Sequence, residues 1–244
     1  MKKLILATAA LALSTGMALA QDATTVRMAT EGAYPPYNFL NDQGEVDGFE
    51  REVGDELCLR AQLTCEWVTN EWDSIIPNLT SGNYDAIAAG MSITDARREV
   101  IGFTQNYMPP ASSAYMGMTA DADITGGVIA AQTSTIQAGY VAESGATLLE
   151  FATYDETVAA VRSGEADAVF ADRDALVPTV EDSGGELVFV GEPVQLGGGI
   201  GMGLRQSDTE LTAKFDAAIT SMKEDGTLNA AIVKWFGEDA TVFE

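Results

Sequence analysis

The 244-residue sequence has no histidine, two cysteines and few basic side chains, with 13 Lys+Arg against 37 Asp+Glu and a formal net charge of −24. The missing histidine removes the commonest general base and metal ligand, and with them Ser-His-Asp and Cys-His nucleophilic sites and most zinc sites. So much negative charge repels phosphate backbones and anionic lipids, which excludes nucleic acid and membrane surfaces as electrostatic partners. Carboxylate chemistry and a cationic ligand remain compatible with this composition.

The first twenty residues have the organisation of a secretory signal peptide. Two lysines follow the initial methionine, residues 4–13 form an apolar run too short to span a bilayer, and a small-x-small cleavage pattern ends at Ala20. We expect cleavage after Ala20, and the next residue, Gln21, is not the cysteine that a lipid anchor would need. No later stretch offers the roughly 18 consecutive apolar residues of a membrane span, so the sequence predicts a soluble, extracytoplasmic mature protein.

The cysteines, Cys58 and Cys65, form the only pair in the chain. In an oxidising compartment this pair favours a disulfide, and nothing else supplies a second pair of metal ligands. Closing so short a loop would stabilise the fold by about 2.5 kcal/mol in the chain-entropy description. The alternative is a pair of reduced, buried thiols.

Short apolar runs alternate with stretches of helical periodicity along the mature sequence. The expected strands are residues 26–29, 66–68, 85–89, 115–118, 128–131, 167–171, 187–190 and 200–204. The expected helices are residues 49–60, 74–80, 136–143, 156–162 and 209–224. This alternation predicts an α/β fold with a largely parallel sheet and crossover helices.

An internal repeat indicates two similar halves. The segment Ser-Gly-Asn-Tyr-Asp-Ala-Ile at residues 81–87 recurs as Ser-Gly-Glu-Ala-Asp-Ala-Val at residues 163–169, each time between a helical stretch and an apolar strand. The glycine of each copy supplies a left-handed helix stop. A single match is also compatible with ordinary helix-to-strand punctuation, but the agreement of the flanking elements favours two α/β lobes built on one plan.

Two breaks in the pattern are candidate crossings between the lobes: a segment around Pro109-Pro110 and a run of three glycines at residues 197–199. We therefore expect lobe 1 to comprise residues 21–111 and 195–244 and lobe 2 to comprise residues 112–194. The C-terminal helices would then return to pack on lobe 1.

Polar side chains follow the predicted strands where each one ends, and ligands in open α/β sheets bind beyond the carboxyl ends of strands and at helix N-termini. These side chains would converge on one cleft if the two lobes face each other. They are Glu31 and Tyr34, then Gly90, Ser92 and Arg97, then Ser134 and Thr135, and finally Asp172.

This set is complementary to an α-amino acid. The ligand carboxylate needs a bidentate fork and backbone donors, which Arg97 and the amides around Ser92 and Thr135 offer. The ammonium needs an anion and neutral acceptors, which Asp172, the Gly90 carbonyl and the Ser92 hydroxyl offer.

A basic ligand side chain would need a second carboxylate and flat aromatic surfaces, and Glu31 with Tyr34 and Trp72 meets that need. Each residue also has a structural alternative. The arginine can be a surface residue, with Arg98 equally eligible by charge, Asp172 can cap a helix, the tryptophan can belong to the core, and one loop glutamate means little in so acidic a chain.

Six motifs occur in order along the mature sequence: residues 29–37, residues 48–50, the two cysteines, residues 72–77, residues 92–97 and residues 208–211. Together they resemble the periplasmic solute-binding proteins of polar amino-acid ABC importers, especially the arginine and lysine/arginine/ornithine binders. The resemblance implies a two-lobed, type II (Venus-flytrap) fold joined by two hinge strands. It also implies closure on the ligand and delivery of that ligand to a membrane permease.

Position by position, the resemblance implies the carboxylate-binding role for Arg97 and the ammonium-binding role for Asp172. The other matches are the main-chain-end contacts Ser92 and Thr135, the aromatic pair Tyr34 and Trp72, and the disulfide Cys58 with Cys65.

The sequence departs from the lysine/arginine/ornithine pattern at three places. It has Ala89-Gly90 where that type has paired serines, Glu31 in place of aspartate and Ile136 in place of glutamine. The first two are nearer the arginine type and also resemble binders of opines such as octopine and nopaline.

We expect a monomeric periplasmic receptor for a basic L-amino acid that serves an ABC importer, with arginine favoured over lysine, ornithine and histidine. We expect no cofactor, metal or catalytic residue, and an opine or another polar amino acid is the alternative ligand. The second hypothesis is a secreted enzyme similar to cyclohexadienyl dehydratases, since one of the many carboxylates could donate a proton. A sensory receptor ectodomain is disfavoured because the sequence lacks a predicted membrane span.

Overall fold

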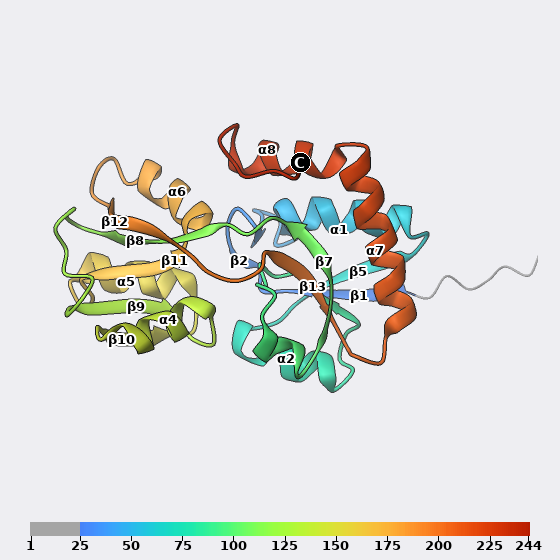
Figure 1. Ribbon diagram of the computed structural model, residues 1–244, viewed down its shortest axis with the longest axis horizontal. Helices are drawn as coiled ribbons and strands as arrows, with labels where there is room; N and C mark the ends of the chain where they lie inside the picture. Colours follow the sequence, from blue (N-terminus) through green and yellow to red (C-terminus); the bar gives the residue numbers. More distant parts are fainter. Residues whose placement is uncertain (1–24) are drawn as a thin grey trace, which may run out of the picture.

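The computed structural model describes residues 25–244, and the predicted signal peptide with its cleavage site lies outside these residues. Two five-stranded sheets, each flanked by helices, form two lobes side by side (Figure 1). The two-lobed α/β architecture expected from the sequence is confirmed.

Lobe 1 is built on a sheet with the strand order β5-β1-β6-β13-β7. Its strands are β1 (Thr25–Thr30), β5 (Thr64–Thr69), β6 (Ala86–Ile87), β7 (Gly102–Met108) and β13 (Ile200–Leu204). Its helices are α1 (Phe49–Arg60), α2 (Trp72–Thr80), α3 (Asp95–Arg98), α7 (Thr209–Glu224) and α8 (Thr227–Phe236). A small antiparallel sheet of β2 (Ala33–Tyr34), β3 (Asn38–Leu40) and β4 (Val46–Asp47) precedes α1.

Lobe 2 is built on a sheet with the order β10-β9-β11-β8-β12. Its strands are β8 (Ser112–Gly117), β9 (Val128–Gln132), β10 (Thr147–Phe151), β11 (Ala168–Asp172) and β12 (Val188–Gln195). Its helices are α4 (Ile136–Ser144), α5 (Tyr154–Ser163) and α6 (Arg173–Asp182).

The two large sheets have the same topology. In lobe 1, β1 pairs in parallel with β5 and β6, and β13 pairs antiparallel to β6 and β7. In lobe 2, β9 pairs in parallel with β10 and β11, and β8 pairs antiparallel to β11 and β12. The two copies of the internal repeat lead into β6 and β11, which hold equivalent places, so the repeat does mark two lobes built on one plan.

The expectation of a largely parallel sheet is wrong, because parallel and antiparallel pairings are equally frequent in the two large sheets. In each large sheet two of the four pairings are antiparallel, because β13 and β8 enter their sheets from the crossings between the lobes. The predicted ranges 49–60, 200–204 and 209–224 coincide with α1, β13 and α7. The predicted elements do not include β7, β10, α6, α8 or the small sheet, and the predicted strand 85–89 is longer than β6.

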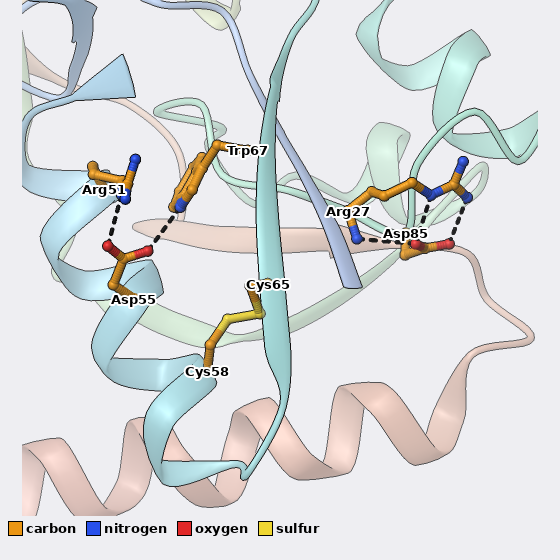
Figure 2. The surroundings of a disulfide bond; sticks show 7 residues. All are labelled: Arg27, Arg51, Asp55, Cys58, Cys65, Trp67 and Asp85. Atoms are coloured by element: carbon orange, nitrogen blue, oxygen red, sulfur yellow. Dashed lines mark hydrogen bonds and ion pairs between the residues drawn. A yellow bond between two sulfur atoms is a disulfide. The ribbon is translucent and has the colours of Figure 1, made fainter. Parts of the chain in front are cut away.

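The predicted disulfide between Cys58 and Cys65 is present and joins the end of α1 to β5 (Figure 2). Beside it, Asp55 accepts hydrogen bonds from Trp67 Nε1 at 2.8 Å and from Arg51 Nε at 2.7 Å. A Cβ at Gly54 would come within 2.6 Å of the Trp67 ring, so the close approach of helix and strand requires glycine there.

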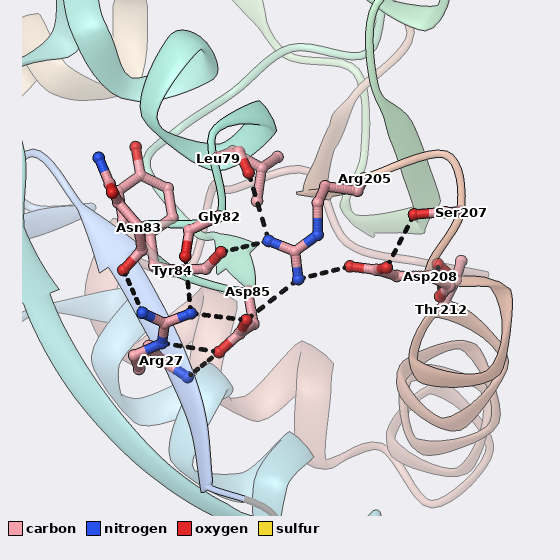
Figure 3. A network of polar contacts seen from close by, with 10 residues as sticks. All are labelled: Arg27, Leu79, Gly82, Asn83, Tyr84, Asp85, Arg205, Ser207, Asp208 and Thr212. Carbon is pink, nitrogen blue, oxygen red and sulfur yellow. Dashed lines mark hydrogen bonds and ion pairs between the residues drawn. The ribbon is translucent and has the colours of Figure 1, made fainter.

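Arg205, directly after β13, connects the segment that returns from lobe 2 to the Tyr84–Asp85 segment of lobe 1 (Figure 3). Its guanidinium donates to the Tyr84 carbonyl at 2.5 Å and pairs with Asp85 at 3.0 Å and Asp208 at 2.7 Å. Asp85 also accepts from Arg27 through Nε, Nη2 and the backbone N–H, each at 3.0 Å. Burial raises the pKa of Asp85, but the hydrogen bonds from the two arginines outweigh it and lower that pKa to about 2.

Two neighbouring segments connect the lobes: residues 109–111 between β7 and β8, and residues 196–199 between β12 and β13. They run side by side, because Met108 pairs with Ile200 and Ser112 pairs with Gln195. Gly199 has a φ of +91°, and a Cβ there would lie 2.6 Å from the Met108 carbonyl oxygen. These segments are where the sequence predicted the crossings, while the residue bounds of the two lobes stay a prediction.

The C-terminal helices α7 and α8 pack against α1 in lobe 1, as expected. Arg60 at the end of α1 donates to Ser221 at 2.9 Å and to Thr227 at 3.0 Å, which holds this contact in place. Over residues 25–244, none of the helices combines the length and the apolar character that a bilayer crossing demands. The same residues contain no cluster of three or more cysteine or acidic side chains suited to a metal ion.

Candidate functional site

A cavity of about 30 Å³ lies between the two lobes. Its polar walls come from the segments that follow β1 and β6 in lobe 1 and from the ends of β9 and β11 in lobe 2. Most of the predicted site residues line it together: Glu31, Tyr34, Trp72, Gly90, Ser92, Arg97, Thr135 and Asp172.

Ser134 is the exception. Its side chain is exposed and does not line this cavity, and its backbone is in the left-handed region with φ +59°. Its carbonyl oxygen instead accepts a hydrogen bond from Arg97 Nη2 at 3.1 Å. Ser134 therefore contributes through its backbone, which holds the arginine from the opposite lobe.

Hydrogen bonds join the lobes around the cavity, so the structure is in a closed arrangement. The pairs are Tyr34 Oη to Asp172 Oδ2 (2.7 Å), Trp72 Nε1 to the Thr133 carbonyl (3.0 Å), Gln132 Nε2 to Glu31 Oε1 (2.6 Å) and Arg97 Nη2 to the Ser134 carbonyl (3.1 Å).

Arg97 is presented by the short helix α3, whose N-cap residue Thr94 accepts a hydrogen bond from the Arg97 backbone N–H. Its Nη1 donates to the Ser92 carbonyl at 2.8 Å, and its guanidinium lies 5.3 Å from the centre of the Trp72 ring. Burial lowers the pKa of Arg97 to about 10, although the Asp172 charge opposes this, so the side chain stays charged at neutral pH. Arg98, equally eligible by charge, is exposed and lies over Phe103 instead.

Asp172 ends β11 and is the N-cap residue of α6, but its side chain makes no capping hydrogen bond. Its Oδ1 accepts from Gln137 Nε2 at 2.9 Å and its Oδ2 accepts from the Tyr34 hydroxyl. Burial raises the pKa of Asp172 to about 6, against the hydrogen bonds from Tyr34 and Gln137. The carboxylate is therefore directed into the cavity and does not serve as a helix cap.

Glu31 is a second partly buried carboxylate in the cavity wall. Burial raises its pKa to about 7, the hydrogen bond from Gln132 opposes this rise, and the charges of Glu71, Asp73 and Glu50 add to it. None of the ion pairs formed within residues 25–244 includes Glu31. A buried carboxylate is costly without a cation, so this site is matched to a positively charged group.

Two aromatic residues border the cavity from lobe 1. Tyr34 stacks on Tyr37 with ring centres 5.5 Å apart and meets the edge of Tyr154 from lobe 2 at 5.4 Å. Trp72 is 8% exposed and packs in a core cluster with Ile75, so the core alternative holds for part of its surface. Trp72 also lines the cavity.

Several lobe 2 residues that line the cavity were not predicted from the sequence. Gln132 is the last residue of β9, one position beyond the predicted strand end. Gln137 and Tyr154 lie in the first turns of α4 and α5. The rule that ligands bind at helix N-termini could have found them. Thr157 and Phe170 also line the cavity, and they lie inside elements whose sequence pattern indicates only burial.

The fold and the site define a two-lobed ligand-binding protein whose cavity carries a guanidinium on one lobe and a carboxylate on the other. The chain belongs to the bacterial extracellular solute-binding proteins, family 3, which match residues 26–238. The resemblance inferred from the sequence motifs is thus confirmed.

A similar solved structure is a periplasmic His/Glu/Gln/Arg/opine family-binding protein from Silicibacter pomeroyi in complex with lysine. It is 75% identical with a TM-score of 0.88, and the match covers 89% of this chain and 100% of that one. The octopine-binding periplasmic protein of Rhizobium meliloti is 30% identical over 96% of this chain and 97% of its own length. The lysine/arginine/ornithine-binding periplasmic protein of Escherichia coli K12 is 30% identical over 97% of each chain. These relatives are binding proteins, not enzymes.

Proposed function

We propose that this protein is a receptor that captures a basic L-amino acid, arginine before lysine, ornithine or histidine, and delivers it to an ABC permease. The observation that carries the proposal is Glu31, a partly buried carboxylate that forms no ion pair within residues 25–244 and lies in the wall of a cavity that Arg97 and Asp172 also line. Arginine and lysine have three charged groups, and the cavity has a complement for each of them.

In this proposal each charged group of the ligand meets a different part of the cavity. The Arg97 guanidinium holds the α-carboxylate, helped by the backbone at Ser134 and Thr135. Asp172 holds the α-ammonium, with the Gly90 carbonyl and the Ser92 hydroxyl as further acceptors.

The ligand side chain lies against Tyr34 and Trp72 and ends at Glu31, through cation–π and ionic contacts. No residue is assigned a catalytic role. The protein works as a monomer after export to the periplasm and cleavage after Ala20.

Closure follows from the division of these groups between the lobes. Arg97 and Glu31 belong to lobe 1, whereas Asp172 and Thr135 belong to lobe 2. A ligand that touches both surfaces stabilises the closed form over the open one, because only the closed form offers every contact at once. The permease would then recognise the closed shape.

A ligand screen tests the proposal. The mature protein is mixed with arginine, lysine, ornithine, histidine, octopine and glutamine, and its melting temperature is measured, since a ligand that binds only the folded form raises it. We expect arginine to give the largest rise and glutamine a small one, with affinities then measured by calorimetry. An equal rise with glutamine would contradict the role of Glu31, and a larger rise with octopine would identify an opine as the ligand. Recovery of chemically altered ligand would support the enzyme hypothesis instead.

A further inference from the structure

Glu50 is a buried acid that the proposed ligand contacts leave unused. It lies in the first turn of α1, is 1% exposed and does not line the cavity. None of the ion pairs found in the described part of the chain includes it. A carboxyl group buried without a cation persists only where several hydrogen bonds hold it.

Both oxygens of Glu50 accept hydrogen bonds from groups next to the cavity. Oε1 accepts from the Gly90 N–H at 2.6 Å and from the Tyr107 hydroxyl, and Oε2 accepts from Asn38 Nδ2 at 2.7 Å. Asn38 is itself fully buried, and its Oδ1 accepts from the Gly32 N–H at 2.7 Å. One continuous chain of hydrogen bonds therefore runs from Gly32 through Asn38 and Glu50 to Gly90.

The direction of this chain is fixed at both ends. The backbone N–H groups of Gly32 and Gly90 can only donate, so each requires an acceptor. The Asn38 oxygen must therefore face Gly32, which turns its NH₂ group toward Glu50. Position 50 must then accept on both of its atoms, which a carboxyl group can do and a glutamine amide cannot.

The two ends of the chain are the ligand-facing turns of lobe 1. Gly32 directly follows Glu31 and has φ +74°, and Gly90 lines the cavity with φ +60°. A Cβ at position 90 would contact the Tyr34 ring at 3.4 Å, so the Gly90 backbone lies against an aromatic wall of the site. Tyr107 extends the same chain to β7, next to the crossing into lobe 2.

We infer that Glu50 and Asn38 are positioning residues that fix the distance between the Glu31–Gly32 turn and the Gly90 turn. The identity of the ligand in this inference rests on the proposed function. Through Gly90 the pair sets where the carbonyl acceptor for the ligand ammonium lies, and through Gly32 it sets where the Glu31 carboxylate lies. Neither Glu50 nor Asn38 touches the ligand.

The first test is Glu50→Gln, which keeps the size of the side chain. It places the new NH₂ group at position 50 against the NH₂ group of Asn38. A buried donor left without an acceptor pushes the two turns apart, so we expect arginine affinity to fall by about 10-fold by calorimetry. The matched control is Glu52→Gln on the same helix. Glu52 accepts from Trp235 at the surface, away from the cavity, and its substitution should leave affinity unchanged.

The second test exchanges the two groups. In the Asn38→Asp, Glu50→Gln double variant, the carboxylate at 38 accepts from both Gly32 and the glutamine amide, whose oxygen still accepts from Gly90 and Tyr107. We expect the double variant to regain an affinity within about 3-fold of the original protein. Asn38→Asp alone places two carboxyl groups together, so its affinity should be low at neutral pH. Its deficit relative to the original protein at the same pH should shrink when acid lets the two groups share a proton.

Amide NMR of the ligand-free protein supplies a reading independent of ligand identity. The Gly32 and Gly90 amide protons should exchange with solvent faster in Glu50→Gln and recover in the double variant. The inference is overturned if folded Glu50→Gln binds arginine like the original protein, or if the double variant is no better than the single variants in affinity or folding. If the original protein binds no basic amino acid, the proposed function fails, and amide exchange alone decides the positioning role.

Discussion

The two lobes share one sheet topology but differ in how they are reinforced. Lobe 1 has the disulfide, the Arg27–Asp85–Arg205 network and the packed C-terminal helices. Within residues 112–194, the sequence has only two basic residues, Arg162 and Arg173. The ion pair of Arg162 with Glu186 spans 3.4 Å between two largely solvent-exposed side chains and adds little stability. Sharing a topology therefore does not mean sharing the interactions that stabilise it.

The lobes also contribute different chemistry to the cavity. Lobe 1 supplies the cation Arg97, the rings of Tyr34 and Trp72, and Glu31. Lobe 2 supplies Asp172, the amides of Gln132 and Gln137, and the rings of Tyr154 and Phe170. Each lobe alone complements only part of a basic zwitterion. The duplicated fold thus gives two half-sites, and only their closure makes a complete one.

The largest loss of binding is expected from Arg97→Ala, which removes the guanidinium from the lobe 1 half-site. Two charge-assisted hydrogen bonds at about 1.5–3 kcal/mol each correspond to a loss of at least about 100-fold in affinity by calorimetry. Arg98→Ala is the matched control, since Arg98 lies on the same helix and outside the cavity. If both variants bind arginine like the original protein, Arg97 is not the carboxylate contact.

The next largest loss is expected from Asp172→Asn in the lobe 2 half-site. It removes the negative charge for the ligand ammonium but keeps an oxygen for the Tyr34 hydroxyl, so we expect a fall of about 10- to 100-fold. Asp182→Asn, at the exposed end of the same helix, should change nothing. Equal affinities for the two variants would mean that lobe 2 contributes shape and no charge.

The lobe 1 half-site was easier to predict from the sequence than the lobe 2 half-site. Glu31 and Gly90 follow β1 and β6 within a few residues, and Arg97 lies in the short helix α3 that comes next, so the strand-end rule finds them. In lobe 2, Gln137 and Phe170 reach the cavity from within a helix and a strand, where periodicity indicates burial but not what the side chain faces.

The missed elements have a similar explanation. The strand β7 contains Thr104, Gln105 and Asn106, and polar residues of that kind are read as a loop, yet Thr104 donates to a backbone carbonyl and its hydroxyl accepts from Met202. Pairing with β13, about a hundred residues later in the chain, makes β7 a strand. Such tertiary contacts override local propensity and cannot be read from a single sequence.

Glu31→Gln and a change of pH are both expected to alter arginine affinity more than the affinity for a neutral amino acid. Burial raises the pKa of Glu31 to about 7 and of Asp172 to about 6 in the closed form, whereas both groups would titrate near 4 when opened to solvent. The closed ligand-free form therefore binds more protons. Its stability is greatest below about pH 4 and falls as pH rises through about 6–7.

A cationic ligand reverses this preference, because it needs Glu31 ionised. We expect arginine affinity to decrease as pH falls from about 7 toward 5, with proton release on binding, measured by calorimetry in buffers of different ionisation enthalpy. Glu31→Gln should lower arginine affinity about 10-fold and change glutamine affinity less. It should also remove the part of the pH dependence near pH 7, which comes from Glu31, and keep the part near pH 6, which comes from Asp172. Equal losses for arginine and glutamine would show that Glu31 does not recognise the ligand side chain. The two half-sites would then differ only in which end of the ligand main chain they bind, the α-carboxylate or the α-ammonium.

The smallest effect on binding is expected from removing the disulfide with Cys58→Ser and Cys65→Ser. The bond closes a loop between α1 and β5, and neither cysteine lines the cavity, so the affinity for the ligand should stay within about 2-fold. The free energy of unfolding should still fall by about 2.5 kcal/mol in denaturant titrations. Because the bond lies wholly in lobe 1, hydrogen exchange should speed up in α1 and β5 and stay unchanged in β9 and β11. Faster exchange in both lobes would show that they unfold as one cooperative unit despite their unequal reinforcement.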